Sequence, residues 1–241
     1  MTGLTDPTRF RVALIQFPGS NCDQDCVDVL QQHFQINPQL VWHQQNELPK
    51  VDAVILPGGF SYGDYLRGGC LASHSPIMKP VKEYGAKGGP IIGICNGFQI
   101  LTESQLLPGA LLPNDSKKFV CEQVTLKAPP GSTPLQKVLS AGEAQFQVPV
   151  AHGEGRYYID QQGLARLWGE GLVAFQYSNK RGQPVVEANP NGSVDHIAGI
   201  VSPDGRILGM MPHPERAADR RTELGTDGLR VLTAFFNQAC G

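Results

Sequence analysis

The sequence lacks several features that would assign it to a functional class at once. Charged residues occupy only 17% of its 241 positions, the formal net charge is -2, and no run of basic residues occurs. The sequence therefore gives no support to non-specific binding of nucleic acid or of an anionic membrane. No apolar run approaches the roughly 18 residues of a membrane-spanning helix. The first ten residues also lack the basic-then-apolar layout of a signal peptide.

Cysteine is sparse and scattered. The six cysteines form no disulfide framework; they lie at positions 22, 26, 70, 95, 121 and 240. We therefore expect reduced thiols in a cytoplasmic protein. Cys22 and Cys26 lie four residues apart on a predicted helix, but they make only half of a metal site, and no second Cys or His pair has matching spacing. The sequence thus predicts no metal site, and the roles of Cys22, Cys26 and Cys70 stay open.

A nucleotide-binding motif is also missing. Residues 58–69, GGFSYGDYLRGG, are rich in glycine but lack the Gly-Lys-Ser/Thr ending of a phosphate loop. We therefore expect no ATP site in this chain. No internal repeat, low-complexity tract or linker interrupts the sequence. We predict a single domain over residues 11–241, preceded by a short N-terminal extension over residues 1–10.

The first half alternates short apolar runs with helical stretches. The runs predicted to be strands are 11–17, 39–43, 51–59 and 90–94, and the predicted helices include 21–34 and 96–105. This alternation predicts βαβ units and an α/β fold with a doubly wound, mostly parallel sheet flanked by helices. Ser20 is predicted to start the first of these helices. Ligands of such sheets bind beyond the carboxyl ends of the strands, where Gly58, Gly59 and Cys95 fall.

The second half has a different pattern. Several apolar segments there read as antiparallel strands, within residues 117–129, 144–155, 155–160 and 171–178. Residues 196–215 predict a hairpin, because two apolar runs flank a Pro-Asp-Gly turn. The final segment, 228–240, predicts an amphipathic helix whose apolar face belongs to the core. We therefore expect an additional antiparallel β section after the parallel one.

Cys95 lies at the junction between a predicted strand and a predicted helix. The surrounding GICNG (93–97) has the form of a nucleophile elbow, in which small residues flank a strained turn that exposes the nucleophile. The N-terminus of a helix also favours the thiolate over the thiol. The alternative interpretation is a buried structural cysteine in a strand-to-helix turn. The pattern by itself does not choose between them.

Two histidines could serve Cys95 as a base. His213 and Glu215 stand two residues apart after a predicted strand, so in an extended segment the carboxylate could orient the imidazole. His152 and Glu154 have the same spacing, although the glycines beside Glu154 suggest a flexible loop. Either histidine could also be a solvated or packing residue. The His213 segment is favoured, because Pro214 restricts its backbone whereas glycines flank Glu154.

An oxyanion site should accompany a thiol that attacks a carbonyl. The backbone amide of Asn96, directly after Cys95, is one candidate donor. The amide of Gly59, after the neighbouring strand, is the other. The alternative is that Gly58 and Gly59 only form a tight turn.

Together these segments resemble the class I, triad-type glutamine amidotransferases, and more closely the glutaminase subunits of phosphoribosylformylglycinamidine synthases from purine biosynthesis. The segments GICNGFQIL and MPHPE carry the likeness to the superfamily. The segments GGFSYGDYLR, AHGEG and GMMPHPERA are more specific to that subunit. The likeness spans nearly the whole chain and implies a single, flavodoxin-like glutamine amidotransferase domain.

The resemblance also implies roles for individual residues. It makes Cys95 the nucleophile, His213 the general acid and base, and Glu215 the carboxylate that orients the imidazole. The remaining implied residues are Gly59 and Asn96 for the oxyanion hole, Gln99 for binding glutamine, and His152 and Glu154 for a loop at the active-site mouth or at a partner.

The resemblance finally implies an activity and its partners. The chain would hydrolyse L-glutamine to glutamate and ammonia through a cysteine thioester, without a metal or cofactor of its own. A separate synthetase subunit, expected to bind ATP and Mg, would use the ammonia to convert formylglycinamide ribonucleotide to formylglycinamidine ribonucleotide. A small bridging subunit would join the two. One alternative is another Cys-dependent hydrolase on the same fold, against which the retained Gln99 argues. The other is a non-catalytic regulatory module, against which the complete triad argues.

Overall fold

A computed structural model describes residues 10–141, 144–219 and 224–239. Nearly all of the predicted N-terminal extension, and Cys240, lie outside the described residues. The predicted domain boundary after residue 10 therefore stays a prediction. Among the described residues, no helix combines the length and apolar character needed to cross a bilayer.

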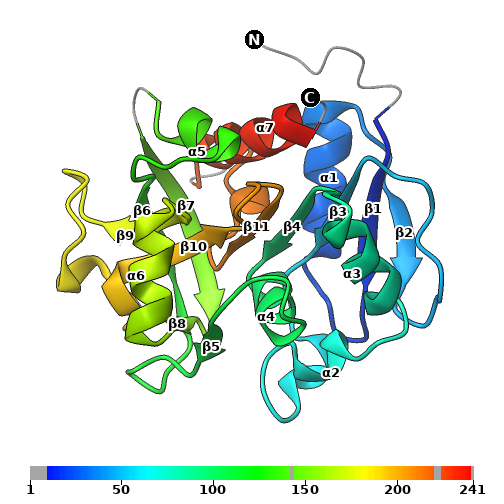
Figure 1. The fold of residues 1–241 in the computed structure, drawn as a ribbon, viewed down its shortest axis with the longest axis horizontal. Coiled ribbons are helices and arrows are strands. Elements are labelled where there is room, and N and C mark those ends of the chain that lie inside the picture. Colours follow the sequence, from blue (N-terminus) through cyan, green and yellow to red (C-terminus); the bar gives the residue numbers. More distant parts are fainter. Residues whose placement is uncertain (1–9, 142–143, 220–223, 240–241) are drawn as a thin grey trace.

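One mixed sheet runs through the described part of the chain in the order β2-β1-β3-β4-β11-β10-β9-β6-β7. The first five strands are parallel; they are β1 (Val12–Gln16), β2 (Gln39–Trp42), β3 (Ala53–Leu56), β4 (Ile91–Ile94) and β11 (Ile207–Met210). The other four are antiparallel; they are β10 (Ile197–Val201), β9 (Val173–Ser178), β6 (Val120–Lys127) and β7 (Gln145–His152). Figure 1 shows the two halves side by side. The predicted fold class is confirmed.

The β10–β11 hairpin joins the two halves of the sheet. Its turn is the predicted one: Gly205 adopts φ +73, and the backbone amide of Ile207 donates to Ser202 Oγ at 2.9 Å. β11 pairs antiparallel with β10 and parallel with β4. The chain that leaves β11 therefore emerges beside the chain that leaves β4, at the carboxyl ends of these two parallel strands.

The helices pack around this sheet (Figure 1). They are α1 (Asp23–Phe34), α2 (Cys70–Ser73), α3 (Met78–Ala86), α4 (Asn96–Glu103), α5 (Pro134–Leu139), α6 (Gln161–Gly169) and α7 (Asp227–Ala239). α4 lies against β3, β4 and β11, and it is buried along nearly its whole length. α7 is the predicted C-terminal helix, and its Phe235 and Phe236 lie in the core as expected.

Several local expectations differ from the structure. Ser20 does not cap the first helix: α1 begins at Asp23 with Cys22 as its N-cap, and Ser20 Oγ instead donates to the carbonyl of Phe17 at 2.9 Å within the preceding turn. The segment 155–160 forms β8 (Arg156–Tyr158), which pairs with β5 (Ala110–Leu112) in a separate two-stranded sheet. The helices α5 and α6 were not expected.

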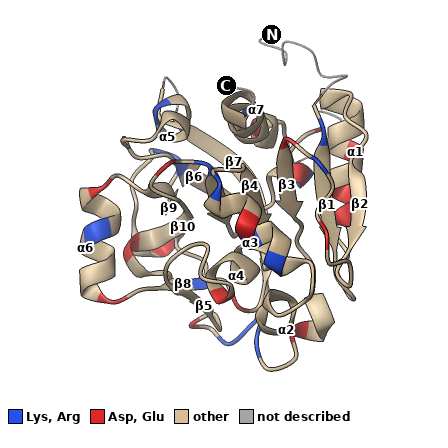
Figure 2. Cartoon of the chain, turned by 45° about the vertical axis from the view of Figure 1, so that its right-hand side comes forward, with Lys and Arg blue, Asp and Glu red and all other residues tan. Residues whose placement is uncertain are grey.

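The surface charge agrees with the sequence. In Figure 2 the Lys and Arg residues are interspersed with Asp and Glu, and no large region of one sign covers the visible side. This distribution matches the formal net charge of -2.

Candidate active site

Cys95 occupies a strained turn between β4 and α4. Its backbone has φ 50 and ψ -106, a conformation that L-residues rarely adopt. A Cβ at Gly97 would lie 2.0 Å from the carbonyl oxygen of Leu56, and one at Gly93 would lie 2.6 Å from the carbonyl oxygen of Gly97. Neither clash can be relieved by a rotamer change, because the neighbouring atoms are main chain. Glycine at both positions is therefore what lets strand and helix approach around the thiol.

His213 and Glu215 follow β11 and form a buried pair. His213 Nδ1 and Glu215 Oε1 lie 2.6 Å apart, and both side chains are 1% exposed. Pro214 begins a short 3-10 turn, Pro214–Arg216, that places the two side chains on the same side. Burial opposes a charge on the imidazole, but the carboxylate of Glu215 and the neighbouring Cys95 outweigh it and raise the pKa of His213 to about 10.

The edge strand β7 contacts both chain segments. The backbone amide of His213 donates to the carbonyl of Pro149 at 2.8 Å. The thiol of Cys95 donates to the carbonyl of Ala151, with a sulfur–oxygen distance of 3.7 Å. These carbonyls stand two residues apart, so they point from the same side of β7. The nucleophile candidate and the base candidate are thus held together by β4, β11 and β7.

The loop that carries one oxyanion candidate, Gly59, is tied to the residue that carries the other, Asn96. Gly59 has φ +125, a region open to glycine, and a Cβ there would lie 2.5 Å from the backbone nitrogen of Asn21. Two residues later, the amide of Ser61 donates to Asn96 Oδ1 at 3.2 Å. This bond ties the loop after β3 to the first residue of α4. The amide of Asn96 is at the helix N-terminus, where no intrahelical acceptor is available.

Gln99 links α4 to the loop that follows β7. Its Nε2 donates to the carbonyl of Glu154 at 2.7 Å, and its Oε1 accepts from Asn96 Nδ2 at 2.8 Å. The carboxylate of Glu154 in turn accepts from the amide of Gly68 at 2.9 Å. Asp64 lies in the same loop as Gly68, and burial together with the charge of Glu154 raises its pKa to about 6.

The rival pair, His152 and Glu154, is not a pair in the structure. His152 is 3% exposed, and its Nε2 lies 3.4 Å from Asn191 Nδ2 rather than near a carboxylate. Burial first, and then the charge of His213, lower the pKa of His152 to about 4. A Cβ at Gly155 would lie 2.4 Å from the imidazole, so this glycine allows close packing.

Residues 152–155 form a hydrogen-bonded turn, not the flexible loop that their glycines suggested. Asn114 Nδ2 donates to the carbonyl of His152, and Asn114 Oδ1 accepts from the amide of Gly155, both at 2.9 Å. Asn191 Nδ2 donates to the carbonyl of Gly155 at 2.9 Å. Two buried amides therefore hold the turn from both sides. The glycines of AHGEG serve packing and hydrogen bonding in a held turn.

Several residues of the site were missed from the sequence. Cys22 lies with His213 and Glu215 in a buried group whose sulfur, nitrogen and oxygen atoms are all within 4.8 Å of one another. Arg216 donates to Asp25 Oδ2 at 2.8 Å and to Cys22 Sγ at 3.1 Å, which fastens the segment of His213 and Glu215 to α1. These contacts depend on where α1 packs, and no local pattern signals them.

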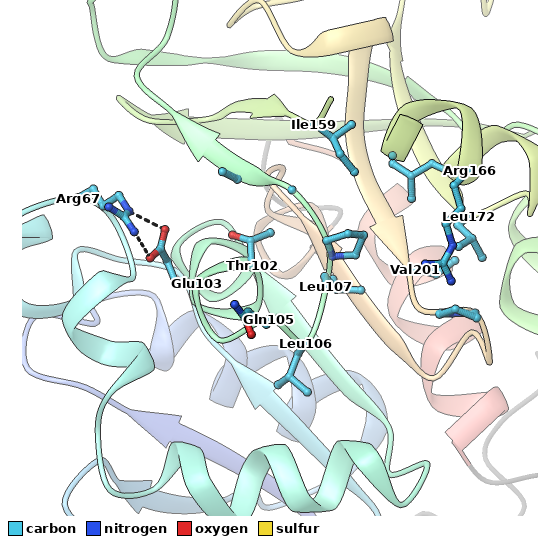
Figure 3. Close-up of a pocket in the computed structure, with 16 residues that line it drawn as sticks. Arg67, Thr102, Glu103, Gln105, Leu106, Leu107, Ile159, Arg166, Leu172 and Val201 are labelled. Carbon is cyan, nitrogen blue, oxygen red and sulfur yellow. Dashed lines mark hydrogen bonds and ion pairs between the residues drawn. The ribbon is translucent and has the colours of Figure 1, made fainter. Parts of the chain in front are cut away.

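A separate cavity of about 650 Å³ lies near the opposite end of α4 from Cys95. Thr102 and Glu103 line one side, and side chains of α6 and the apolar residues Leu106 and Leu107 line others (Figure 3). Arg67 spans part of its rim through a two-bond pair with Glu103, at 2.7 and 2.6 Å. None of the predicted site residues lines this cavity.

Comparisons with known proteins agree with this geometry. The model of the CobB/CobQ-like glutamine amidotransferase domain matches residues 9–225. Subunit PurQ of phosphoribosylformylglycinamidine synthase from Thermomicrobium roseum is 48% identical over 94% of this chain and 95% of its own. The same subunit from Thermus thermophilus is 50% identical over 91% and 94%. A chain of the PurLQS structure from Thermotoga maritima superposes with a TM-score of 0.80 at 38% identity, over 95% of this chain and 98% of that one. The chain therefore belongs to the glutamine amidotransferases with a CobB/CobQ-like domain and, among these, to the PurQ subunits of phosphoribosylformylglycinamidine synthase.

Proposed function

We propose that the chain is the glutaminase subunit of this synthase and that Cys95, His213 and Glu215 are its catalytic triad. The observation that carries the assignment is the meeting of a strained, glycine-flanked cysteine with a buried His–Glu pair at one edge of the sheet. Cys95 lies close enough to His213 to help raise the pKa of the imidazole, while its thiol hydrogen bond goes to the carbonyl of Ala151. This proximity supports a triad in which Cys95 is the nucleophile and the His213–Glu215 pair supplies its base.

In the first half of the reaction, the Cys95 thiolate attacks the side-chain carbonyl carbon of glutamine, and a C–S bond forms. His213, protonated at neutral pH because its pKa is raised, donates a proton to the departing nitrogen. The C–N bond breaks and ammonia leaves. Glu215 accepts the hydrogen bond from Nδ1 throughout, which fixes the orientation of the imidazole.

The second half regenerates the enzyme. His213, now neutral, takes a proton from water, and the resulting hydroxide attacks the thioester carbon. The C–S bond breaks, glutamate leaves, and the thiolate returns beside the imidazolium. In both halves the oxygen that becomes negative would accept hydrogen bonds from the amides of Asn96 and Gly59. The new γ-carboxyl group loses its proton to ammonia or solvent, so the reaction balances as glutamine and water giving glutamate and ammonium.

Glutamine would bind between α4 and the two loops that Gln99 and Glu154 join. We assign Gln99 to holding the substrate, because it lies one turn after Cys95 and fixes the position of residue 154 through a 2.7 Å hydrogen bond. Glu154 belongs to the loop at the mouth of the site. The buried ring of His152 lies behind this loop, where its Nε2 contacts Asn191 Nδ2, and Asn191 in turn holds the carbonyl of Gly155.

The ammonia would pass to a synthetase subunit, PurL in the PurLQS assembly, with PurS as the small third subunit. Formylglycinamide ribonucleotide, ATP and Mg would bind to the synthetase, and the chain itself would need no cofactor. A cytoplasmic location is part of this proposal. The cysteines at positions 22, 26, 70, 95 and 121 are free thiols, which suits a reducing compartment.

Glutamate release and amidine synthesis together test the assignment. The purified chain is assayed with glutamine alone, and then with PurL, PurS, ATP and formylglycinamide ribonucleotide. We expect weak release alone, faster release with the partners, and none from Cys95→Ala. The control Cys121→Ser removes an exposed thiol and should keep the wild-type rate.

An ammonium salt supplied in place of glutamine provides the second control. The complex with Cys95→Ala should still make the amidine from added ammonium, because only the glutaminase step is lost. Glutamate release that survives Cys95→Ala would remove Cys95 as the nucleophile. Glutamine-dependent amidine synthesis by the variant complex would support a non-catalytic module instead.

A further inference from the structure

A second thiol lies beside the proposed triad. Cys22 is the N-cap of α1, and its Sγ, a ring nitrogen of His213 and a carboxylate oxygen of Glu215 all lie within 4.8 Å of one another. The three residues are 3%, 1% and 5% exposed. The glutaminase mechanism uses His213 and Glu215 but assigns no step to Cys22.

Gly58 is the residue that allows this approach. A Cβ at position 58 would lie 2.8 Å from His213 Cε1 and 3.2 Å from Cys22 Sγ. Any larger residue would therefore separate α1 from the triad segment. The absence of a side chain at Gly58 thus places the thiol against the His–Glu pair.

The donor atoms suit a borderline-soft divalent cation. Thiolate sulfur, imidazole nitrogen and carboxylate oxygen are the three ligand types of zinc sites, whereas Mg²⁺ and Ca²⁺ prefer all-oxygen sites. Zinc bonds to sulfur and nitrogen measure about 2.3 and 2.0–2.1 Å, so donors up to 4.8 Å apart would have to draw together by about an ångström. Glu215 Oε2 is buried and has no hydrogen-bond partner among the described residues, which leaves one acceptor available for a cation.

The charges around the group also permit a cation. The guanidinium of Arg216 lies 3.1 Å from Cys22 Sγ and opposes a metal ion there. The carboxylates of Glu215 and Asp25 counter it, since Asp25 already pairs with Arg216 at 2.8 Å. Replacing the thiol proton and the imidazolium proton of His213 by one divalent ion gives a thiolate, a carboxylate and a neutral imidazole around two positive charges, which is a neutral set.

We propose that Cys22, His213 and Glu215 form an inhibitory site for Zn²⁺. On binding, Zn–S and Zn–N bonds form at Cys22 and His213, the thiol proton and the imidazolium proton leave to solvent, and the oxidation state of zinc does not change. The metal would hold the imidazole and the carboxylate that catalysis requires, and it would stop glutamine hydrolysis. The inhibitory effect rests on the proposed function, but the binding of the metal does not.

Cobalt spectroscopy tests the binding without any activity. Co²⁺ is titrated into the full chain carrying Cys95→Ala, so that the proposed nucleophile cannot supply the sulfur. We expect one equivalent to produce a near-ultraviolet sulfur-to-cobalt charge-transfer band, which Zn²⁺ then removes. The double variant Cys95→Ala, Cys22→Ser keeps a polar group facing Arg216 but should show no such band.

Two further thiols provide matched controls in the same background. Cys26→Ala alters a buried cysteine on the next turn of α1, and Cys121→Ser alters an exposed one. Both variants should keep the band. If circular dichroism shows that Cys22→Ser is unfolded, Cys22→Ala replaces it. No band in Cys95→Ala, or a band that survives the loss of Cys22, would overturn the site.

Inhibition of glutamate release gives the second measurement. These variants keep Cys95, and the inhibition of each is measured relative to its own rate without zinc. Cys22→Ser should raise the zinc concentration that gives half-inhibition at least tenfold over wild type, whereas Cys26→Ala should leave that concentration unchanged. An equal half-inhibition in Cys22→Ser would refute the inhibitory role. Absence of glutamate release without zinc would refute the proposed function instead, and the cobalt result would still stand.

Discussion

Replacing Glu215 by glutamine should impair both the activity and the stability of the chain. The substitution keeps the size of the side chain but removes the charge that lies 2.6 Å from His213 Nδ1. Without this charge, less opposes the effect of burial, and the pKa of His213 falls from about 10 toward its ordinary value of 6.5. The imidazolium that should protonate the leaving ammonia is then largely lost at neutral pH.

The size of the effect follows from the pKa and from triad chemistry. One pH unit of pKa difference corresponds to about 1.4 kcal/mol, so the difference between 6.5 and about 10 sets an upper scale of about 5 kcal/mol for the buried imidazolium. Both Glu215 and Cys95 contribute to this stabilisation of the imidazolium, so the part that Glu215 contributes is a few kcal/mol. We expect kcat/KM for glutamine to fall by up to about 10⁴-fold, the loss in kcat that follows replacement of the orienting carboxylate in a serine-protease triad.

The stability effect should depend on pH in one direction. The folded-state pKa of His213 is raised above its unfolded value, so the pair contributes its full stability below pH 6.5 and loses it as the pH rises toward about 10. Urea unfolding of wild type and Glu215→Gln should therefore differ more at pH 6 than at pH 10.

Glutamate release and urea unfolding of the same preparations provide the assay. Glu170→Gln is the matched control, because it removes a carboxylate from an exposed ion pair with Arg166. It should change neither measurement appreciably. A kcat/KM for Glu215→Gln within threefold of wild type, or a stability difference that grows between pH 6 and pH 10, would refute the reasoning.

Two other substitutions have expected outcomes. Gly97→Ala places a Cβ 2.0 Å from the main-chain oxygen of Leu56, so we expect it to lower stability by about 1–3 kcal/mol and to reduce glutamate release. The control Gly169→Ala meets no neighbour and should be tolerated. An unchanged thermal unfolding temperature of Gly97→Ala would contradict the steric argument. The lowered pKa of His152, about 4, means that its stability contribution is present above pH 6.5 and is lost as the pH falls toward 4. His152→Gln should therefore lessen acid destabilisation in that window, and an unaltered stability profile between pH 4 and 6.5 would contradict it.

The sequence predicted those parts of the site that depend on neighbours in the chain. The spacing of Gly93, Cys95 and Gly97 indicates an elbow, because strand, turn and helix are consecutive. His213 and Glu215 indicate a pair, because Pro214 limits the backbone between them. The β10–β11 hairpin was visible for the same reason, since its turn residues are adjacent.

The rest depends on segments that meet only in the folded chain. Cys22 reaches the triad because α1 packs beside the segment that follows β11, and His152 finds Asn191 rather than Glu154 across a buried turn. Spacing alone therefore could not choose between the two His–Glu candidates. The missed helix α6 is different, because Asp160 caps it locally through a 2.7 Å bond to the amide of Gly163. Its apolar residues are also spaced as on one face of a helix, and Leu167 of that face is buried, so α6 could have been predicted.

The position of β11 has a consequence for synthesis of the protein. β11 lies between β4 and β10, yet it is the last strand of the sheet to leave the ribosome. Until it inserts, the parallel half carrying Cys95 and the antiparallel half are not joined, and His213 is not yet in place. A nascent chain therefore holds the Cys95 thiol without its proposed base, and glutamine hydrolysis should begin only when almost the whole polypeptide has been made. Completion of the sheet and onset of catalysis become a single event.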